Sequence, residues 1–219
     1  TEASNRTIGI ETGELDLAYD IEGLDREKLR NDDSIVFLEE PSFGIDYIGF
    51  NTRKAPFDNV KVRQAIATAI NADDFITAVY KGSGEKANSL IGPKVFGYTT
   101  EAKAWEYNVE KAKQLLAEAG YPDGFEVTFD APNDRYMNDE QIAQAVAGYL
   151  EKVGIKVNLN LMPKANFFSY IKPLENKSMF LMTGWSDASG DGLSLMHDML
   201  YTYDREAGNG GVNRGHYSN

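Results

Sequence analysis

A strand–helix–strand succession in the second half of the chain constrains the fold more than any other feature. Apolar and polar residues alternate over 125–129 as in a strand, and the alternation returns over 155–161. Between these runs, apolar residues recur at helical spacing from 142 to 153, and Gly154 is placed to end the helix. Because such βαβ units join parallel strands, the pattern predicts an α/β fold.

Helical patterns with capping residues surround this unit. An Asn or Asp precedes most of them, and such side chains cap helix N-termini. Gln141 stands three residues after Asn138, as in a capping box. The predicted helices cover residues 58–70, 71–82, 108–120, 138–154 and 166–172. Residues 82–107 have no clear period and are predicted to form a long ordered loop, and 179–182 form a further buried run.

The first fifty residues have a different pattern. A short helix is predicted to end near Gly13, and a strand to follow in which Leu15, Leu17 and Tyr19 alternate with polar residues. Residues 34–39 and 47–50 are further strand candidates. We expect these three runs to form a small sheet or the edge of a larger one, because the pattern shows no long helix between them.

Composition excludes several function classes. The 219 residues carry 22 Lys and Arg against 34 Asp and Glu, a formal net charge of −12. Nucleic acid is an unexpected partner for such a chain, because phosphate binding depends on clustered basic residues. The chain has no cysteine, which excludes disulfides, Cys-ligated metals and thiol nucleophiles. No motif implies a cofactor.

Enzyme motifs are weak in this sequence. Neither a G-x-S-x-G nucleophile elbow nor a glycine-rich phosphate loop occurs. A rival hypothesis remains, a small α/β hydrolase or metal-dependent enzyme that uses Asp187, Asp191 and His197. The neighbouring pair His197-Asp198 is expected to face different sides of a helix, and Asp191 to cap that helix. This reading predicts a structural turn rather than a metal site.

Two loops are better candidates for a binding site. Segments 131–137 and 183–191 each follow a predicted parallel strand, and ligands of open α/β sheets collect beyond the carboxyl ends of such strands. We therefore expect the loops to share one edge. Arg135 offers a planar guanidinium to a carboxylate, and Asp187 a carboxylate to an ammonium group. Tyr136 and Trp185 offer aromatic walls, although Trp185 is equally compatible with core packing. The other candidate ligand contacts are Asn133, Gly184 and Ser186.

Four stretches resemble a known family. Residues 50–66 read FNTRKAPFDNVKVRQAI, and this run is similar to the marker segment of extracellular solute-binding proteins of the peptide/nickel class, the receptors of ABC importers. Residues 11–16, ETGELD, resemble a turn of that family before a strand. Residues 111–125, KAKQLLAEAGYPDGF, are similar to its helix exit, and VGIKV at 153–157 followed by Gly184-Trp185 agrees in order and spacing.

The resemblance implies a two-lobed clamshell of the class II periplasmic-binding-protein type. Residues 1–50 would be a partial first lobe and hinge strand, and 51–219 the second lobe, incomplete at its C-terminus. Peptide-binding relatives place an aspartate after the Gly-Trp pair that accepts the ligand's amino group. Counting from Trp185 puts that position at Ala188, so Asp187 stands one residue early. Relatives also place an arginine upstream for the ligand carboxylate, and Arg135 is the nearest candidate.

The function implied is non-catalytic binding of a solute, an oligopeptide or dipeptide, and its delivery to an importer. The expected partners are that solute, the ABC permease subunits in the membrane and the missing first lobe of the same protein. A monomer is expected, in the periplasm or lipid-anchored at the cell surface of a bacterium. No cofactor and no metal are expected.

Overall fold

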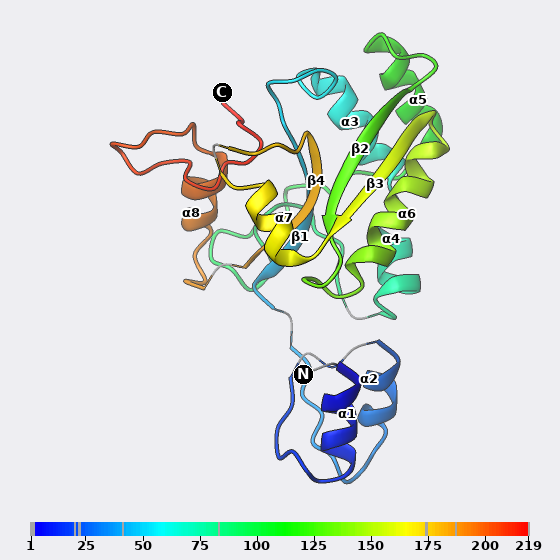
Figure 1. The fold of residues 1–219 in the computed structure, drawn as a ribbon, viewed down its shortest axis with the longest axis vertical. Helices are drawn as coiled ribbons and strands as arrows, with labels where there is room; N and C mark the ends of the chain where they lie inside the picture. Colours follow the sequence, from blue (N-terminus) through cyan, green and yellow to red (C-terminus); the bar gives the residue numbers. More distant parts are fainter. Residues whose placement is uncertain are drawn as a thin grey trace.

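A computed structural model describes residues 3–19, 21, 23–40, 42–82, 84–173, 175–186 and 188–218. Figure 1 shows two parts, a small N-terminal unit and a larger α/β unit joined by the chain around residue 42. The N-terminal unit contains helices α1 (Ala3–Glu11) and α2 (Gly23–Arg30). In the described part of the chain no helix is long and apolar enough to span a bilayer.

The two N-terminal helices pack against each other. The Thr7 hydroxyl donates a hydrogen bond of 2.8 Å to the Asp25 carboxylate, and Lys28 forms an ion pair with Glu11. Leu29 of α2 is buried. Helix α2 was not expected from the sequence, which predicted a sheet in this region.

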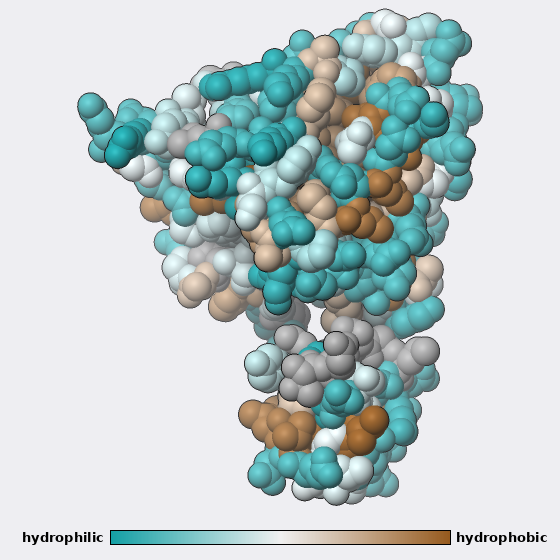
Figure 2. All heavy atoms as spheres, in the orientation of Figure 1, coloured by the Kyte–Doolittle hydropathy of each residue, from teal (hydrophilic) through white to brown (hydrophobic). Residues whose placement is uncertain are grey.

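Two strands predicted in the N-terminal unit are not formed. Residues 15–19 and 34–39 have irregular backbone, and α2 lies between them. A strand needs a neighbour for its backbone hydrogen bonds, and neither segment pairs with one among the described residues. Their apolar side chains therefore remain in solvent, with Leu17 82% and Val36 85% exposed. Figure 2 shows brown apolar patches on this unit.

The α/β unit is built on a four-stranded sheet in the order β1-β4-β2-β3. The strands are β1 (Gly44–Phe50), β2 (Phe125–Pro132), β3 (Ile155–Met162) and β4 (Phe180–Ser186). β2 and β3 pair in parallel over their whole lengths, which confirms the predicted βαβ unit. β1 pairs antiparallel with β4, so the predicted strand at 47–50 is confirmed and belongs to this sheet.

Most helices cover one face of the sheet. They are α3 (Val60–Ala69), α4 (Ala72–Asp74) with the π-helix η1 (Phe75–Val79), α5 (Val109–Glu118) and α6 (Asp139–Glu151). The predicted caps Asn59, Asn71 and Asn108 each accept a hydrogen bond from a backbone N–H of the first turn. The core between helices and sheet includes the fully buried rings of Phe57, Phe129 and Phe180.

The opposite face has a smaller cover. Helix α7 (Lys164–Tyr170), predicted at 166–172, packs Phe167 and Ile171 against Leu181 of β4. Helix α8 (Gly192–Leu195) and the π-helix η2 (Met196–Leu200) follow β4. The long segment 84–107 has no helix or strand, as predicted, and Phe96 anchors it to the turn before α8 by backbone hydrogen bonds with Gly190 and Gly192.

Candidate functional site

The candidate site lies where the parallel strands end. β2 and β4 share a single register pair, Asp130 with Leu181, and β2 ends two residues later at Pro132. Tyr136, in the loop after β2, contacts β4 beyond this end. Its hydroxyl lies 3.0 Å from the Thr183 hydroxyl and accepts a hydrogen bond of 2.7 Å from the Gly184 N–H. The two loops that the sequence predicted to share an edge are therefore in direct contact.

The loop after β2 is fixed by Asp139, the first residue of α6. Its carboxylate accepts hydrogen bonds from the backbone N–H groups of Arg135 at 2.9 Å, Tyr136 at 3.0 Å and Glu140 at 3.0 Å. Asp139 is buried, so these bonds satisfy a charge that has little access to water. This carboxylate sets the position of both Arg135 and Tyr136.

The predicted capping box at Asn138 and Gln141 is wrong. Asn138 has a left-handed backbone with φ of 55° and makes no side-chain cap bond. Its side-chain amide instead donates to the Val79 carbonyl at 3.1 Å, which ties α6 to η1. Asp139, the first residue of α6, accepts one N–H of the first turn, that of Glu140, and its other two bonds come from the loop before the helix.

Arg135 and Asn133 stand at the solvent side of this loop. The Arg135 side chain is exposed, and its guanidinium carbon lies 5.1 Å from the centre of the Tyr136 ring. Asn133 is also exposed, and its backbone N–H donates to the Met162 carbonyl at 3.0 Å, beyond the last pair of the β2–β3 ladder. Both side chains are therefore accessible to a ligand at this edge.

Asp46 of β1 was missed by the sequence reasoning. It pairs in register with Gly184 of β4, and a Cβ on Gly184 would lie 2.5 Å from the Asp46 Oδ1 and 2.7 Å from Tyr136. Glycine is required there by this close approach. The Tyr80 hydroxyl donates to the Asp46 Oδ2 at 3.2 Å. A single acid within the otherwise apolar strand 45–50 was the available signal, but its neighbours come from distant segments.

The Asp46 carboxylate has a perturbed pKa. Burial against the neighbouring groups raises its pKa, although one side of the residue still faces solvent. The Tyr80 hydrogen bond and the charge of Arg135 oppose this rise, and the charge of Asp139 adds to it. Burial of the Tyr80 phenol raises its pKa, and the Asp46 carboxylate raises it further. The edge of the sheet thus holds a negative charge that the protein only partly compensates.

Trp185 and Ser186 end β4 at this edge. Ser186 is exposed and pairs in register with Gly44. Trp185 is half-buried, and its indole Nε1 is buried without a hydrogen-bond partner in the described part of the chain. A buried donor without an acceptor is costly, so an added acceptor that reached this N–H would be stabilising. Asp187 lies outside the described residues, and Ala188 is exposed.

Two residues of the rival enzyme hypothesis, Asp191 and His197, lie in the described part of the chain, and each makes a local contact. The Asp191 carboxylate accepts a hydrogen bond from the Leu193 N–H at 2.9 Å and caps α8, as predicted. His197 does not face away from Asp198, because its Nδ1 lies 3.2 Å from the Asp198 Oδ1. Among the described residues no group of three or more His, Asp or Glu side chains could hold a metal ion.

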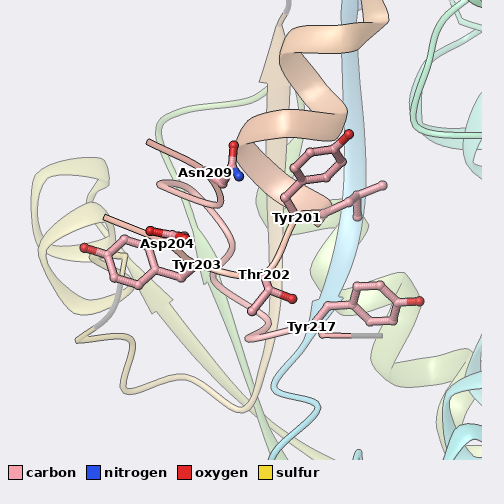
Figure 3. Close-up of a pocket in the computed structure, with 7 residues that line it drawn as sticks. Tyr201, Thr202, Tyr203, Asp204, Asn209 and Tyr217 are labelled. Atoms are coloured by element: carbon pink, nitrogen blue, oxygen red, sulfur yellow. The ribbon is translucent and has the colours of Figure 1, made fainter. Parts of the chain in front are cut away.

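A separate hollow of about 450 Å³ lies in the C-terminal segment, as Figure 3 shows. Its lining residues are Leu200, Tyr201, Thr202, Tyr203, Asp204, Asn209 and Tyr217. None of them belongs to the sheet edge. The Asp204 Oδ1 in its lining accepts hydrogen bonds from the backbone N–H groups of Glu206 and Ala207 in its own turn.

Comparison with known proteins gives one family. A model described as bacterial extracellular solute-binding proteins, family 5 Middle, matches residues 1–207. The chain is 36% identical over 202 residues to Heme-binding protein A of Haemophilus influenzae, which covers 91% of this chain and 37% of that protein. It is 35% identical over 170 residues to the Dipeptide-binding protein of Escherichia coli, covering 76% and 31%.

Solved structures agree with this result. The periplasmic binding protein DppA from Helicobacter pylori in complex with the peptide STSA has a TM-score of 0.83 and 26% identity, covering all of this chain and 41% of that one. A dipeptide binding protein from Pseudoalteromonas in complex with Met-Leu has a TM-score of 0.84 and 28% identity, covering 100% and 43%. The chain thus spans about a third of the curated relatives named above and about two fifths of these structures.

Proposed function

This chain belongs to the bacterial extracellular solute-binding proteins of family 5, and from that membership we propose that it is part of a receptor that delivers a solute to an ABC importer. We propose an oligopeptide or dipeptide as that solute. Similar structures hold STSA and Met-Leu, and a similar curated protein is named for dipeptides. The receptor binds and releases its solute without chemical change and needs no cofactor.

The observation that carries this proposal is the edge of the sheet where β2 ends beside β4. Aromatic, cationic and acidic side chains meet there, and the indole N–H of Trp185 has no partner among the described residues. Figure 1 shows that this end of the sheet is the one nearer to the N-terminal unit. A peptide could lie between the two parts and contact both.

The proposed mechanism is closure of two lobes around the solute. Residues 1–50 contribute part of the first lobe and the hinge strand β1, and 51–219 most of the second lobe. A solute that contacts both lobes stabilises the closed form by its greater affinity for that form. The connection near residue 42 leads directly into β1, so a rotation there would move Asp46 and its neighbours relative to the first lobe.

The sequence-predicted side chains take defined roles in this proposal. Trp185 and Tyr136 form aromatic walls, and Arg135 pairs with a solute carboxylate. Gly184 and Ser186 present backbone and hydroxyl groups, Asn133 an amide, and Asp187 a carboxylate. The permease subunits receive the solute from a monomeric receptor in the bacterial envelope, either periplasmic or lipid-anchored.

Purification of the receptor that contains this chain tests the proposal. Mass spectrometry of the released ligand is expected to identify peptides, and calorimetry with Met-Leu and with peptides of three to five residues is expected to give saturable binding. The isolated chain should bind the same peptides weakly or not at all, because it supplies half a cleft. Release of a non-peptide solute, with no heat from any peptide, would contradict the peptide proposal.

A further inference from the structure

We propose that Asp46 and Tyr80, beside Tyr136, form a subsite for a positively charged group of the solute, an ammonium or a guanidinium. The subsite deepens the proposed function and rests on it. It adds a residue from the hinge strand β1 and one from the segment after η1 to an edge otherwise formed by β2 and β4. Neither residue belongs to the segments that resemble a binding loop in sequence.

The carboxylate of Asp46 has unused capacity for hydrogen bonds. An ionised carboxylate can accept about four, and in the described part of the chain it accepts one, the 3.2 Å bond from the Tyr80 hydroxyl. That bond is at the long end of the normal range for O–H donors. The residue also faces solvent, so a ligand can reach the remaining lone pairs.

This carboxylate forms no ion pair in the part of the chain that the structure describes. None of the ion pairs formed among the described residues includes Asp46. Arg135, whose charge lowers the pKa of Asp46, stacks over the Tyr136 ring with its guanidinium carbon 5.1 Å from the ring centre. The second acid at the edge, Asp139, is occupied by three backbone N–H groups, and its charge raises the pKa of Asp46. A cation entering this edge therefore meets one carboxylate that forms no ion pair among the described residues.

The Asp46 carboxylate packs against Gly184 of the neighbouring strand, since its Oδ1 would lie 2.5 Å from a Cβ there. Gly184 leaves no room for a side chain between Asp46 and Tyr136. The Tyr136 hydroxyl is held by the Gly184 N–H and lies beside Thr183, so this wall is rigid. The Asp46 side chain is thus supported on the side of the sheet and open on the side of the solvent, as a ligand contact requires.

A purely structural role is the competing explanation. The bond from Tyr80 could simply fix η1 to the sheet, and the acid would then matter for stability alone. The two roles differ in what Asp46→Asn does, since the amide keeps an acceptor for Tyr80 and removes only the charge. A structural role predicts a change in melting temperature without a change in ligand preference.

The test uses calorimetry on the full receptor with two pairs of probes. Ala-Ala-Ala is compared with its N-acetylated form, and Ala-Lys-Ala with Ala-norleucine-Ala. In the wild type, removal of the positive charge is expected to weaken binding at least tenfold in one pair, since a hydrogen bond between charged groups contributes that much. In Asp46→Asn this difference should vanish, with the melting temperature at neutral pH equal to or above that of the wild type.

Asp58→Asn is the matched control. It removes the same charge at a position beside Asn59 and Tyr121, next to the start of α3, and should leave both probe differences intact. If Asp46→Asn keeps the full probe difference, or weakens all peptides alike while lowering the melting temperature, the subsite proposal is overturned. Wild-type receptor that binds none of the four peptides would instead contradict the proposed function, and the subsite with it.

Discussion

The Tyr136 hydroxyl accepts a hydrogen bond of 2.7 Å from the Gly184 N–H, which joins the loop after β2 to the end of β4. β2 ends at Pro132, before this level, so the phenol continues the contact between the two segments beyond the strand. This hydrogen bond holds the loop after β2 against the end of β4. Its contribution to the free energy of unfolding can be measured.

Tyr136→Phe should lower the free energy of unfolding by about 1–2 kcal/mol, because the half-buried Gly184 N–H loses its acceptor. Urea denaturation of the chain measures this change. Tyr107→Phe is the control, since the Tyr107 ring packs on Tyr149 and its hydroxyl has no hydrogen bond in the described part of the chain. Equal stability of the two variants would show that the Tyr136 hydroxyl bond contributes nothing.

Gly184→Ala should destabilise the chain by about 1–3 kcal/mol, since the new Cβ would lie 2.5 Å from Asp46 and 2.7 Å from the Tyr136 ring. Gly148→Ala is a control of the opposite sign. Gly148 lies within α6 with open space around its Cα, so alanine there should stabilise by about 0.5–1 kcal/mol. Thermal denaturation measures both changes. A shift of both melting temperatures in the same direction would contradict the packing at Gly184.

Trp185→Ala should weaken peptide binding by the full receptor by more than ~1 kcal/mol, as loss of a central aromatic contact does. Trp185→Phe keeps a ring and removes the indole N–H, and it should cause part of the same loss if the solute accepts from Nε1. Trp105→Ala, at an exposed tryptophan, should leave binding unchanged. An unchanged dissociation constant with a lower melting temperature would assign Trp185 to core packing.

Local sequence patterns predicted most of the α/β unit and little of the N-terminal unit. The helices at Asn59 and Asn108 depend on a cap and a periodic face within one segment, so their signals are complete in the sequence. A strand is completed only by a neighbour, and at 15–19 and 34–39 none is present among the described residues. The alternation there predicted strands that the structure does not form, since the neighbour that a strand needs is not found among the described residues.

Sequence reasoning likewise found some residues of the site and missed others. Arg135, Tyr136 and Gly184 follow strand ends and could be found from that position alone. Asp46 and Tyr80 could not, because their contact depends on the antiparallel pairing of β1 with β4 and on the position of η1. Neither of these contacts between distant segments can be recognised from a motif within one segment of the sequence.

The raised pKa of Asp46 predicts a pH-dependent contribution to stability. Its pKa is higher in the folded than in the unfolded chain, so folding takes up protons between the two values. The stability of the wild type relative to Asp46→Asn should therefore rise as pH falls through the folded pKa and be fully present below the unfolded value of about 4. Urea titrations of both proteins from neutral pH to about pH 4 measure it, and a constant or reversed difference would contradict the raised pKa.

Amide exchange tests whether the two irregular segments find partners in the full receptor. In the described part of the chain, residues 16–19 and 36–40 donate no backbone hydrogen bond to another backbone group. The side chains of Leu17, Val36 and Leu38 are more than 80% exposed. Large exposed apolar surfaces of this kind mark sites of contact.

We expect these amides to exchange rapidly in the isolated chain and to be protected in the full receptor, where the rest of the first lobe can supply neighbouring strands. Amides of β2 and β3 provide the internal reference, since their ladder is complete and they should be protected in both proteins. Rapid exchange of both segments in the receptor as well would show that the alternation at 15–19 and 34–39 does not encode strands.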